Sequence, residues 1–195
     1  MPLKDVLVEE LRDMYSAENQ LVKALPKLAK GANNAKLKEL FTAHLEQTKS
    51  QVERLKEVFE HLDEKPTGER CAGMEGIIEE GKSALDKDEE GASFDVGLIG
   101  AALRTEHYEI AAYQAAIAMA KTLGMQDVID LLAQNLDEEM AAAAKITEAA
   151  KPILRESSEE PEQKKKPRSA KEKDSAQKSR EDERHTATGA RKRAS

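Results

Sequence analysis

Apolar residues recur every three or four positions along four long segments, which is the spacing of one buried face of an α-helix. These segments cover about residues 3–30, 35–62, 94–123 and 126–154. Residues that favour strands are scarce, and no alternation of apolar and polar positions extends beyond a few residues. The hydrophobic pattern therefore predicts an all-α fold built from four long amphipathic helices.

The lengths of the connections constrain how these helices are arranged. Only a few residues join the first helix to the second and the third to the fourth, and such short links force antiparallel neighbours. About thirty residues, 63–93, separate the second helix from the third, and a short helix at 74–85 fits within them. We therefore expect a ferritin-like four-helix bundle with a long crossover between helices 2 and 3.

Charge divides the chain into two parts. The last forty residues, 156–195, contain no Val, Ile, Leu, Met, Phe, Tyr or Trp, and they carry 12 basic and 9 acidic residues. The first 155 residues carry 19 basic and 29 acidic residues, so the formal net charge of −7 is the sum of −10 and +3. A segment without large apolar residues cannot offset the entropy cost of ordering. We therefore expect a helical bundle at 1–155 and a disordered basic tail at 156–195.

Several classes of protein are excluded by what the sequence lacks. The single cysteine, Cys71, excludes a disulfide within the chain and any zinc or iron–sulfur site that needs several cysteines. No run of 18 apolar residues is present, so we expect no membrane span. The acidic start lacks the apolar core of a signal peptide, so we expect a cytoplasmic location. The sequence also contains no glycine-rich phosphate loop, nucleophile elbow or H-E-x-x-H zinc motif.

A few polar residues lie at the centre of the apolar stripes, where their side chains would point into the core. Glu18, Glu106 and Glu139 occupy such positions in the first, third and fourth helices, and His44 lies on the stripe of the second. Counted from the turns between the helices, all four reach a similar depth. We therefore expect three carboxylates and one imidazole to converge near the middle of the bundle.

Neighbouring residues extend this set of candidate ligands. Glu109 follows Glu106 by one helical turn and can supply a second carboxylate from the same helix. Thr48 and Gln51 in the second helix, together with Tyr113 in the third, can form hydrogen bonds to the ligands. We assign these last three residues to a supporting shell around the site.

A carboxylate buried in an apolar core is costly unless something compensates its charge. Glutamates and histidine in a bundle core are typical ligands of di-iron and di-manganese sites, so this set predicts a di-iron site, with manganese as the other candidate metal. Two alternatives stay open at this point. The residues can form a hydrogen-bonded network without metal, or one stripe is misphased and its glutamate is solvated.

Five stretches of the chain carry a resemblance to a known family. They are LRDMYSAENQLVKALPKLA from Leu11, HLEQTKSQVERLKEVFEHL from His44, CAGMEGIIEEG from Cys71, EHYEIAAYQ from Glu106 and LLAQNLDEEM from Leu131. In order and spacing, they resemble the YciE/YciF family of ferritin-like bacterial stress proteins, which are often named as ferroxidases. The resemblance covers about residues 3–154.

The resemblance implies a ferritin-like fold, a homodimer and a rubrerythrin-like di-metal site, and it implies a role in the stress response. One feature departs from the usual pattern of ferritin-like iron oxidases, which place Glu-x-x-His on two helices. This chain contains no Glu-x-x-His. The site is therefore expected to hold fewer ligands than a full ferroxidase centre.

Two functions fit these observations. The first is a di-iron oxidoreductase that oxidises Fe(II) or consumes peroxide at the glutamate and histidine ligands. The alternative is a metal-free structural or interaction protein of the stress response, which binds DNA non-specifically through its tail.

The charge of the tail supports this alternative. From residue 163 onward the chain has 12 basic and 5 acidic residues, a balance that favours binding to a phosphate backbone by counterion release. An inert, solubilising tail is the other interpretation. The candidate nucleic-acid contacts are Lys164, Lys165, Lys166, Arg191, Lys192 and Arg193.

Overall fold

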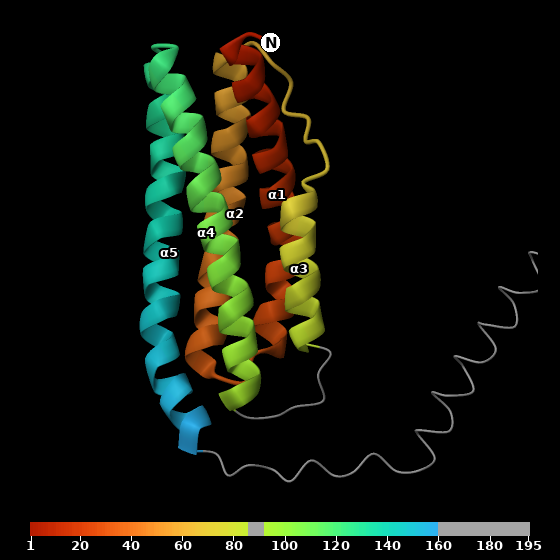
Figure 1. Ribbon diagram of the computed structural model, residues 1–195, viewed down its shortest axis with the longest axis vertical. Helices are drawn as coiled ribbons and strands as arrows, with labels where there is room; N and C mark the ends of the chain where they lie inside the picture. Colours follow the sequence, from red (N-terminus) through yellow and green to blue (C-terminus); the bar gives the residue numbers. More distant parts are fainter. Residues whose placement is uncertain (86–91, 160–195) are drawn as a thin grey trace, which may run out of the picture. The chain divides into compact units, whose positions relative to one another are not determined.

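The computed structural model of the protein describes residues 1–85 and 92–159 (Figure 1). Within these residues the chain forms five helices and no strand, which confirms the all-α prediction. The helices are α1 (Leu3–Gly31), α2 (Ala35–His61), α3 (Ala72–Leu85), α4 (Ala92–Thr122) and α5 (Gln126–Glu159). No helix in the described ranges is long and apolar enough to cross a membrane.

Helix α5 continues further than the sequence predicts. Its apolar pattern predicts an end near Leu154, yet the helix runs to Glu159 with Pro152 inside it. A proline in a helix interior removes one backbone hydrogen bond, but Ile153 is buried against the core and holds this turn in place. Residues 156–159 are therefore helical although we expect them in the tail. The remainder of the predicted tail, with its six candidate nucleic-acid contacts, lies outside the described residues.

Short turns join the long helices in pairs. Asn34 caps α2, because its side-chain oxygen accepts hydrogen bonds from the backbone N–H groups of Lys36 and Leu37 at 2.9 and 3.2 Å. Between α4 and α5 the chain turns at Gly124, whose φ of +69° lies in the left-handed region that favours glycine. Each turn makes the two helices that it joins antiparallel neighbours (Figure 1).

Helix α3 forms part of the long connection between the end of α2 and the start of α4. It packs against α1 and α4, and Figure 1 shows it beside α1. As a result, α2 and α4 run in the same direction, while α1 and α5 run in the opposite one. Helices α1 and α5 each pack against both α2 and α4. The four long helices therefore enclose a common interior.

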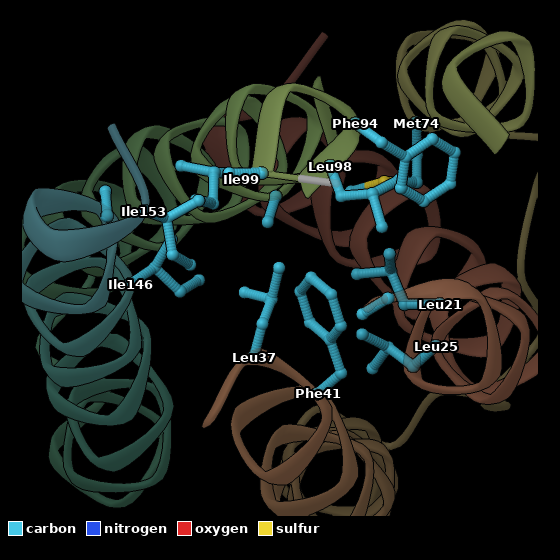
Figure 2. Packing of buried hydrophobic residues seen from close by; sticks show 14 of the residues in the cluster. Leu21, Leu25, Leu37, Phe41, Met74, Phe94, Leu98, Ile99, Ile146 and Ile153 are labelled. Carbon is cyan, nitrogen blue, oxygen red and sulfur yellow. The ribbon is translucent and has the colours of Figure 1, made fainter. Parts of the chain in front are cut away.

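This interior contains two separate clusters of buried apolar side chains. In the first, Leu21, Phe41, Leu98 and Ile146 converge from the four long helices (Figure 2). The second lies further along the same helices, nearer to the N-terminus of α1 and of α5. Its fully buried members include Leu7, Leu11, Leu55, Phe59, Tyr113 and Leu132. The fold is thus held by an apolar cluster on each side of the middle of the helices.

A buried aspartate ties the start of α4 to the α1–α2 turn. Asp95 is 2% exposed, and its two carboxylate oxygens accept hydrogen bonds from the backbone N–H groups of Asn33 and Asn34 at 2.8 and 2.6 Å. These N–H groups belong to a turn, so they have no partner in a helix. Asp95 therefore fixes the ends of three helices relative to one another.

Removal of this carboxylate should destabilise the fold. Asp95→Ala leaves two backbone N–H groups without a charged acceptor, and hydrogen bonds to charged groups contribute roughly 1.5–3 kcal/mol each. We expect the free energy of unfolding, measured by urea titration, to fall by about 3 kcal/mol. Asp137→Ala, at an exposed position of α5, is the control and should change it by less than about 0.5 kcal/mol. Equal stability of the two variants would contradict the role given to Asp95.

Candidate metal centre

A layer of buried polar side chains separates the two apolar clusters. Along each long helix, residues of one cluster give way to polar residues and then to residues of the other cluster. The layer consists of Glu18, His44, Thr48, Gln51, Thr105, Glu106, Glu109, Asn135 and Glu139. The candidate ligands are all at most 5% exposed. This excludes the alternative in which one apolar stripe is misphased and its glutamate faces solvent.

Four of these side chains form a compact quartet. His44 of α2, Glu106 and Glu109 of α4 and Glu139 of α5 each offer one ligand atom, and these atoms lie within 4.8 Å of one another. The imidazole Nε2 of His44 is 3.3 Å from Glu106 Oε1 and 3.7 Å from Glu139 Oε2. Side chains that lie far apart in the sequence therefore meet at one point, where a single cation could contact all four.

Most polar atoms of the quartet have no hydrogen-bond partner. Both oxygens of Glu109, one oxygen each of Glu106 and Glu139, and both ring nitrogens of His44 are buried and unpaired. The His44 ring lies within ion-pairing distance of two carboxylates, but the atoms are not aligned as hydrogen bonds. Each buried polar group without a partner costs roughly 1–3 kcal/mol. The quartet is thus an incomplete network, and a cation would supply the missing partner.

Glu18 of α1 lies outside the quartet but next to it. One carboxylate oxygen accepts a hydrogen bond from the Tyr113 hydroxyl, and the other has no partner. The negative charge of Glu139 raises the pKa of Glu18, and both side chains are buried in the same polar layer. The structure therefore brings together four of the five predicted ligands and places Glu18 beside them.

The predicted supporting residues differ in what they contact. The Gln51 amide donates a hydrogen bond to Glu139 Oε1, and the Tyr113 hydroxyl donates one to Glu18. The Thr48 hydroxyl instead donates to the backbone carbonyl of His44 at 2.9 Å. A threonine in a helix commonly bonds to the carbonyl four residues before it, so Thr48 contacts the backbone of α2 rather than a ligand side chain.

Two supporting residues were not predicted from the sequence. Asn135 is fully buried and donates to the Tyr113 hydroxyl at 2.9 Å, while its side-chain oxygen accepts a hydrogen bond from Arg54. Arg54 also pairs with Glu138, which is 29% exposed at its side chain. Asn135 precedes Glu139 by one helical turn, so its position on the buried stripe of α5 was the signal available. A continuous polar chain therefore connects Glu18 to the surface.

Comparison with known proteins identifies the family. The family model described as a domain of unknown function, DUF892, matches residues 2–159. The chain belongs to this family. Protein YciF of Escherichia coli K12 is 42% identical to it over 149 residues, which make up 76% of this chain and 90% of YciF. The resemblance to the YciF family is thereby confirmed.

Solved structures agree with this assignment. The crystal structure of the E. coli stress protein YciF matches with a TM-score of 0.77 and 40% identity, over 80% of this chain and 98% of that one. The protein YcfI of Rhodopseudomonas palustris matches with a TM-score of 0.73 and 40% identity, over 75% and 94%. A protein of Xanthomonas campestris, 23% identical with a TM-score of 0.60, shares the fold.

Burial and mutual repulsion favour the neutral form of the carboxyl groups in this YciF-family site. Burial raises the pKa of Glu18, Glu106 and Glu109 well above its ordinary value of 4.5, and the negative charges of neighbouring glutamates raise it further. The hydrogen bond from Tyr113 partly offsets this shift at Glu18. Burial, followed by the charge of Glu18, also raises the pKa of the Tyr113 hydroxyl. A cation bound by these glutamates must therefore displace protons from them.

These shifts predict how the stability of the metal-free protein depends on pH. A carboxyl group whose pKa is higher in the folded state stabilises the fold fully below its unfolded pKa, and this contribution is lost as the pH rises through the folded pKa. In the presence of a chelator, we expect the melting temperature to fall from pH 5 to pH 8. The free energy of unfolding should fall by about 1.4 kcal/mol per pH unit for each extra proton that the folded state holds relative to the unfolded state.

A double variant provides the control for this pH dependence. Glu106→Gln with Glu109→Gln removes two of the groups with a raised pKa, so its melting temperature should fall less steeply over the same pH range. A parallel pH dependence of the wild type and this variant, measured by calorimetry, would show that these carboxyl groups do not titrate abnormally.

Proposed function

We propose that this protein is a ferritin-like stress protein that binds a pair of iron ions in its core and oxidises Fe(II) or consumes peroxide there. The observation that carries the proposal is the buried quartet of His44, Glu106, Glu109 and Glu139, whose ligand atoms converge and lack other partners. The similarity to the stress protein YciF of Escherichia coli also supports the proposal.

The path of the chain supports the ferritin-like four-helix bundle as the finer description of the fold. Helices α1, α2, α4 and α5 enclose one interior, and the connection through α3 makes α2 parallel to α4. Bundles with one long crossover have this arrangement, and their metal sites are built from inward glutamates and histidines of facing helices. The quartet draws its members from three of these four helices.

The donor set fits iron. Three carboxylates and one imidazole are hard and borderline ligands, which suit Fe(II) and also Mn(II), so manganese is the second candidate. Glu18 is placed to add a carboxylate beside the quartet, since one of its oxygens has no partner. When bound, iron supplies electrons: two Fe(II) give one each to hydrogen peroxide, which takes up two protons and forms two molecules of water.

The protein's own side chains have three tasks in this proposal. The carboxylates bind and orient the cations, and Gln51 holds Glu139 in position through its hydrogen bond. The two apolar clusters on either side keep bulk water and larger reductants away from the reacting atoms. The raised pKa values of Glu106 and Glu109 make metal binding dependent on the loss of protons.

Metal binding is the direct test. Anaerobic titration of the metal-free protein with Fe(II) and with Mn(II), followed by calorimetry, should show binding that becomes tighter as the pH rises. Glu109→Gln keeps the shape of the side chain but removes its charge, and we expect it to weaken binding by roughly tenfold or more. Glu18→Ala combined with Glu106→Ala should abolish the paired site.

Glu57→Gln, which changes an exposed glutamate of α2, is the matched control and should leave the affinity unchanged. Failure of both metals to bind the wild type would favour the alternative, a metal-free structural or interaction protein. Binding without oxidation on addition of O₂ or peroxide would restrict the protein to metal binding.

The basic tail supports a second, independent proposal of non-specific DNA contact. Its balance of 12 basic to 5 acidic residues from residue 163 onward favours counterion release from a phosphate backbone. Because α5 runs to Glu159, a truncation after Glu159 removes the tail and leaves the helix intact. We expect the truncated protein to lose retention on duplex DNA at low salt while its melting temperature stays the same. Equal retention of both proteins would assign the tail a purely solubilising role.

Assembly and location follow as proposals from the family resemblance. We propose a homodimer in the cytoplasm. Sedimentation equilibrium of the full chain would give twice the mass of one chain in the first case, and fractionation of cells would test the second.

A further inference from the structure

A small cavity lies between α2 and α5 and reaches the candidate metal centre. Its volume is about 50 Å³, and Phe41 and Ile146 form part of a mostly apolar wall. His44 also lines it, and this is the member of the quartet that the cavity reaches. Because His44 Nε2 lies 3.3 Å from Glu106, one imidazole ring contacts both the cavity and the carboxylates.

The charge around this cavity is unlike that of the site behind it. No carboxylate lines the cavity, although three belong to the quartet. Its polar lining consists of Gln47, His44 and the exposed Lys145. In the described part of the chain, Lys145 forms no ion pair and Gln47 forms no hydrogen bond. The lining of the cavity therefore carries a lysine charge and no carboxylate, which favours a neutral molecule over a divalent cation there.

The cavity has room for a small molecule. About 10–15 Å³ of space of this kind holds one water molecule, so a cavity of about 50 Å³ can accept one molecule of O₂ or hydrogen peroxide. The free amide of Gln47 and the ring of His44 offer hydrogen bonds to peroxide, while the apolar wall suits O₂.

A larger cavity elsewhere does not compete for this role. It measures about 270 Å³ and lies among α1, α3 and α4, with Leu21, Ile78 and Ala101 in its wall. None of the quartet residues lines it, and the rim carries charges of both signs. Of these two cavities, only the one beside His44 is lined by a member of the quartet.

We propose that the cavity lined by His44, Gln47 and Lys145 binds the small neutral oxidant, O₂ or hydrogen peroxide, and delivers it to the metal centre, while Fe(II) enters by another route. This inference rests on the proposed function and adds the route and the class of the second substrate. The oxidant accepts the electrons that Fe(II) donates. Hydrogen peroxide with two Fe(II) and two protons gives two molecules of water and two Fe(III), and O₂ with two Fe(II) and two protons gives hydrogen peroxide and two Fe(III).

Two variants fill the cavity without touching a candidate ligand. Ala142→Val adds two methyl groups at a buried position of the wall, and Ala43→Phe places a ring at the exposed rim. The matched control is Ala141→Phe, at the exposed position next to Ala142, which does not line the cavity. If Ala142→Val prevents folding, Ala43→Phe still tests the cavity, because it changes an exposed residue.

The loaded protein gives the first readout. With Fe(II) bound, we expect both filling variants to react with hydrogen peroxide roughly tenfold more slowly or slower still, because a filled cavity leaves only transient openings of a close-packed interior. The rate of Co(II) association, followed by absorption, should be unchanged in all variants. Wild-type protein should react with hydrogen peroxide far faster than with tert-butyl hydroperoxide, and the separate O₂ and peroxide arms show which oxidant uses the cavity.

The metal-free protein gives a second readout that does not depend on activity. Dissolved O₂ is paramagnetic, so it should enhance the NMR relaxation of the Ile146 methyl groups and of the His44 ring protons in the wild type. This enhancement should fall in Ala43→Phe and persist in Ala141→Phe.

The outcomes separate this inference from the proposed function. Absence of metal binding overturns the function, and O₂ relaxation that is equal in the wild type and Ala43→Phe overturns the cavity as a route for a neutral oxidant. Normal metal binding with peroxide rates equal to the wild type in both filling variants also overturns the route alone. Slower Co(II) association in the filling variants makes the cavity a cation route and contradicts the assignment to a neutral oxidant.

Discussion

The burial of several carboxylates in one layer of the interior is the constraint on which the rest of the structure depends. Glu18, Glu106, Glu109 and Glu139 are buried together, away from bulk solvent. Each raises the cost of ionising its neighbours, as the raised pKa values of the first three show. A fold that tolerates this layer must gain its stability elsewhere, and the two apolar clusters on either side provide it.

The two apolar clusters on either side of the polar layer also determine how closely the positions of the ligand atoms are fixed. Side chains of the quartet come from three helices, so their spacing depends on how those helices pack rather than on any local turn. The apolar clusters fix this packing on both sides, and Asp95 fixes the ends of α1, α2 and α4. Ligand atoms held in this way would already be arranged before a cation bound, which would reduce the reorganisation that binding requires.

The sequence predicts the parts of this structure that follow from periodicity along a single helix. Glu106 and Glu139 could be found because a glutamate at the centre of an apolar stripe must point inward. Periodicity does not tell which groups of other helices lie opposite a buried residue. The hydrogen bond from Arg54 to Asn135 and the role of Asp95 therefore could not be predicted. Periodicity also does not tell that Thr48 bonds to the backbone of its own helix instead of to a ligand. The end of α5 was missed because burial of Ile153 outweighs the local effect of a proline.

The balance of charge within the layer argues for a cation from outside. Arg54 lowers the pKa of Glu18 through its charge, but it is half-buried and already paired with Glu138. His44 could supply one positive charge at most, against three carboxylates within its reach. A purely internal network would also pair its donors and acceptors, whereas both oxygens of Glu109 are without a partner. A bound cation would relieve both the unpaired acceptors and the cost of ionising several carboxyl groups together, whereas in the metal-free protein the raised pKa values of Glu18, Glu106 and Glu109 favour their neutral forms.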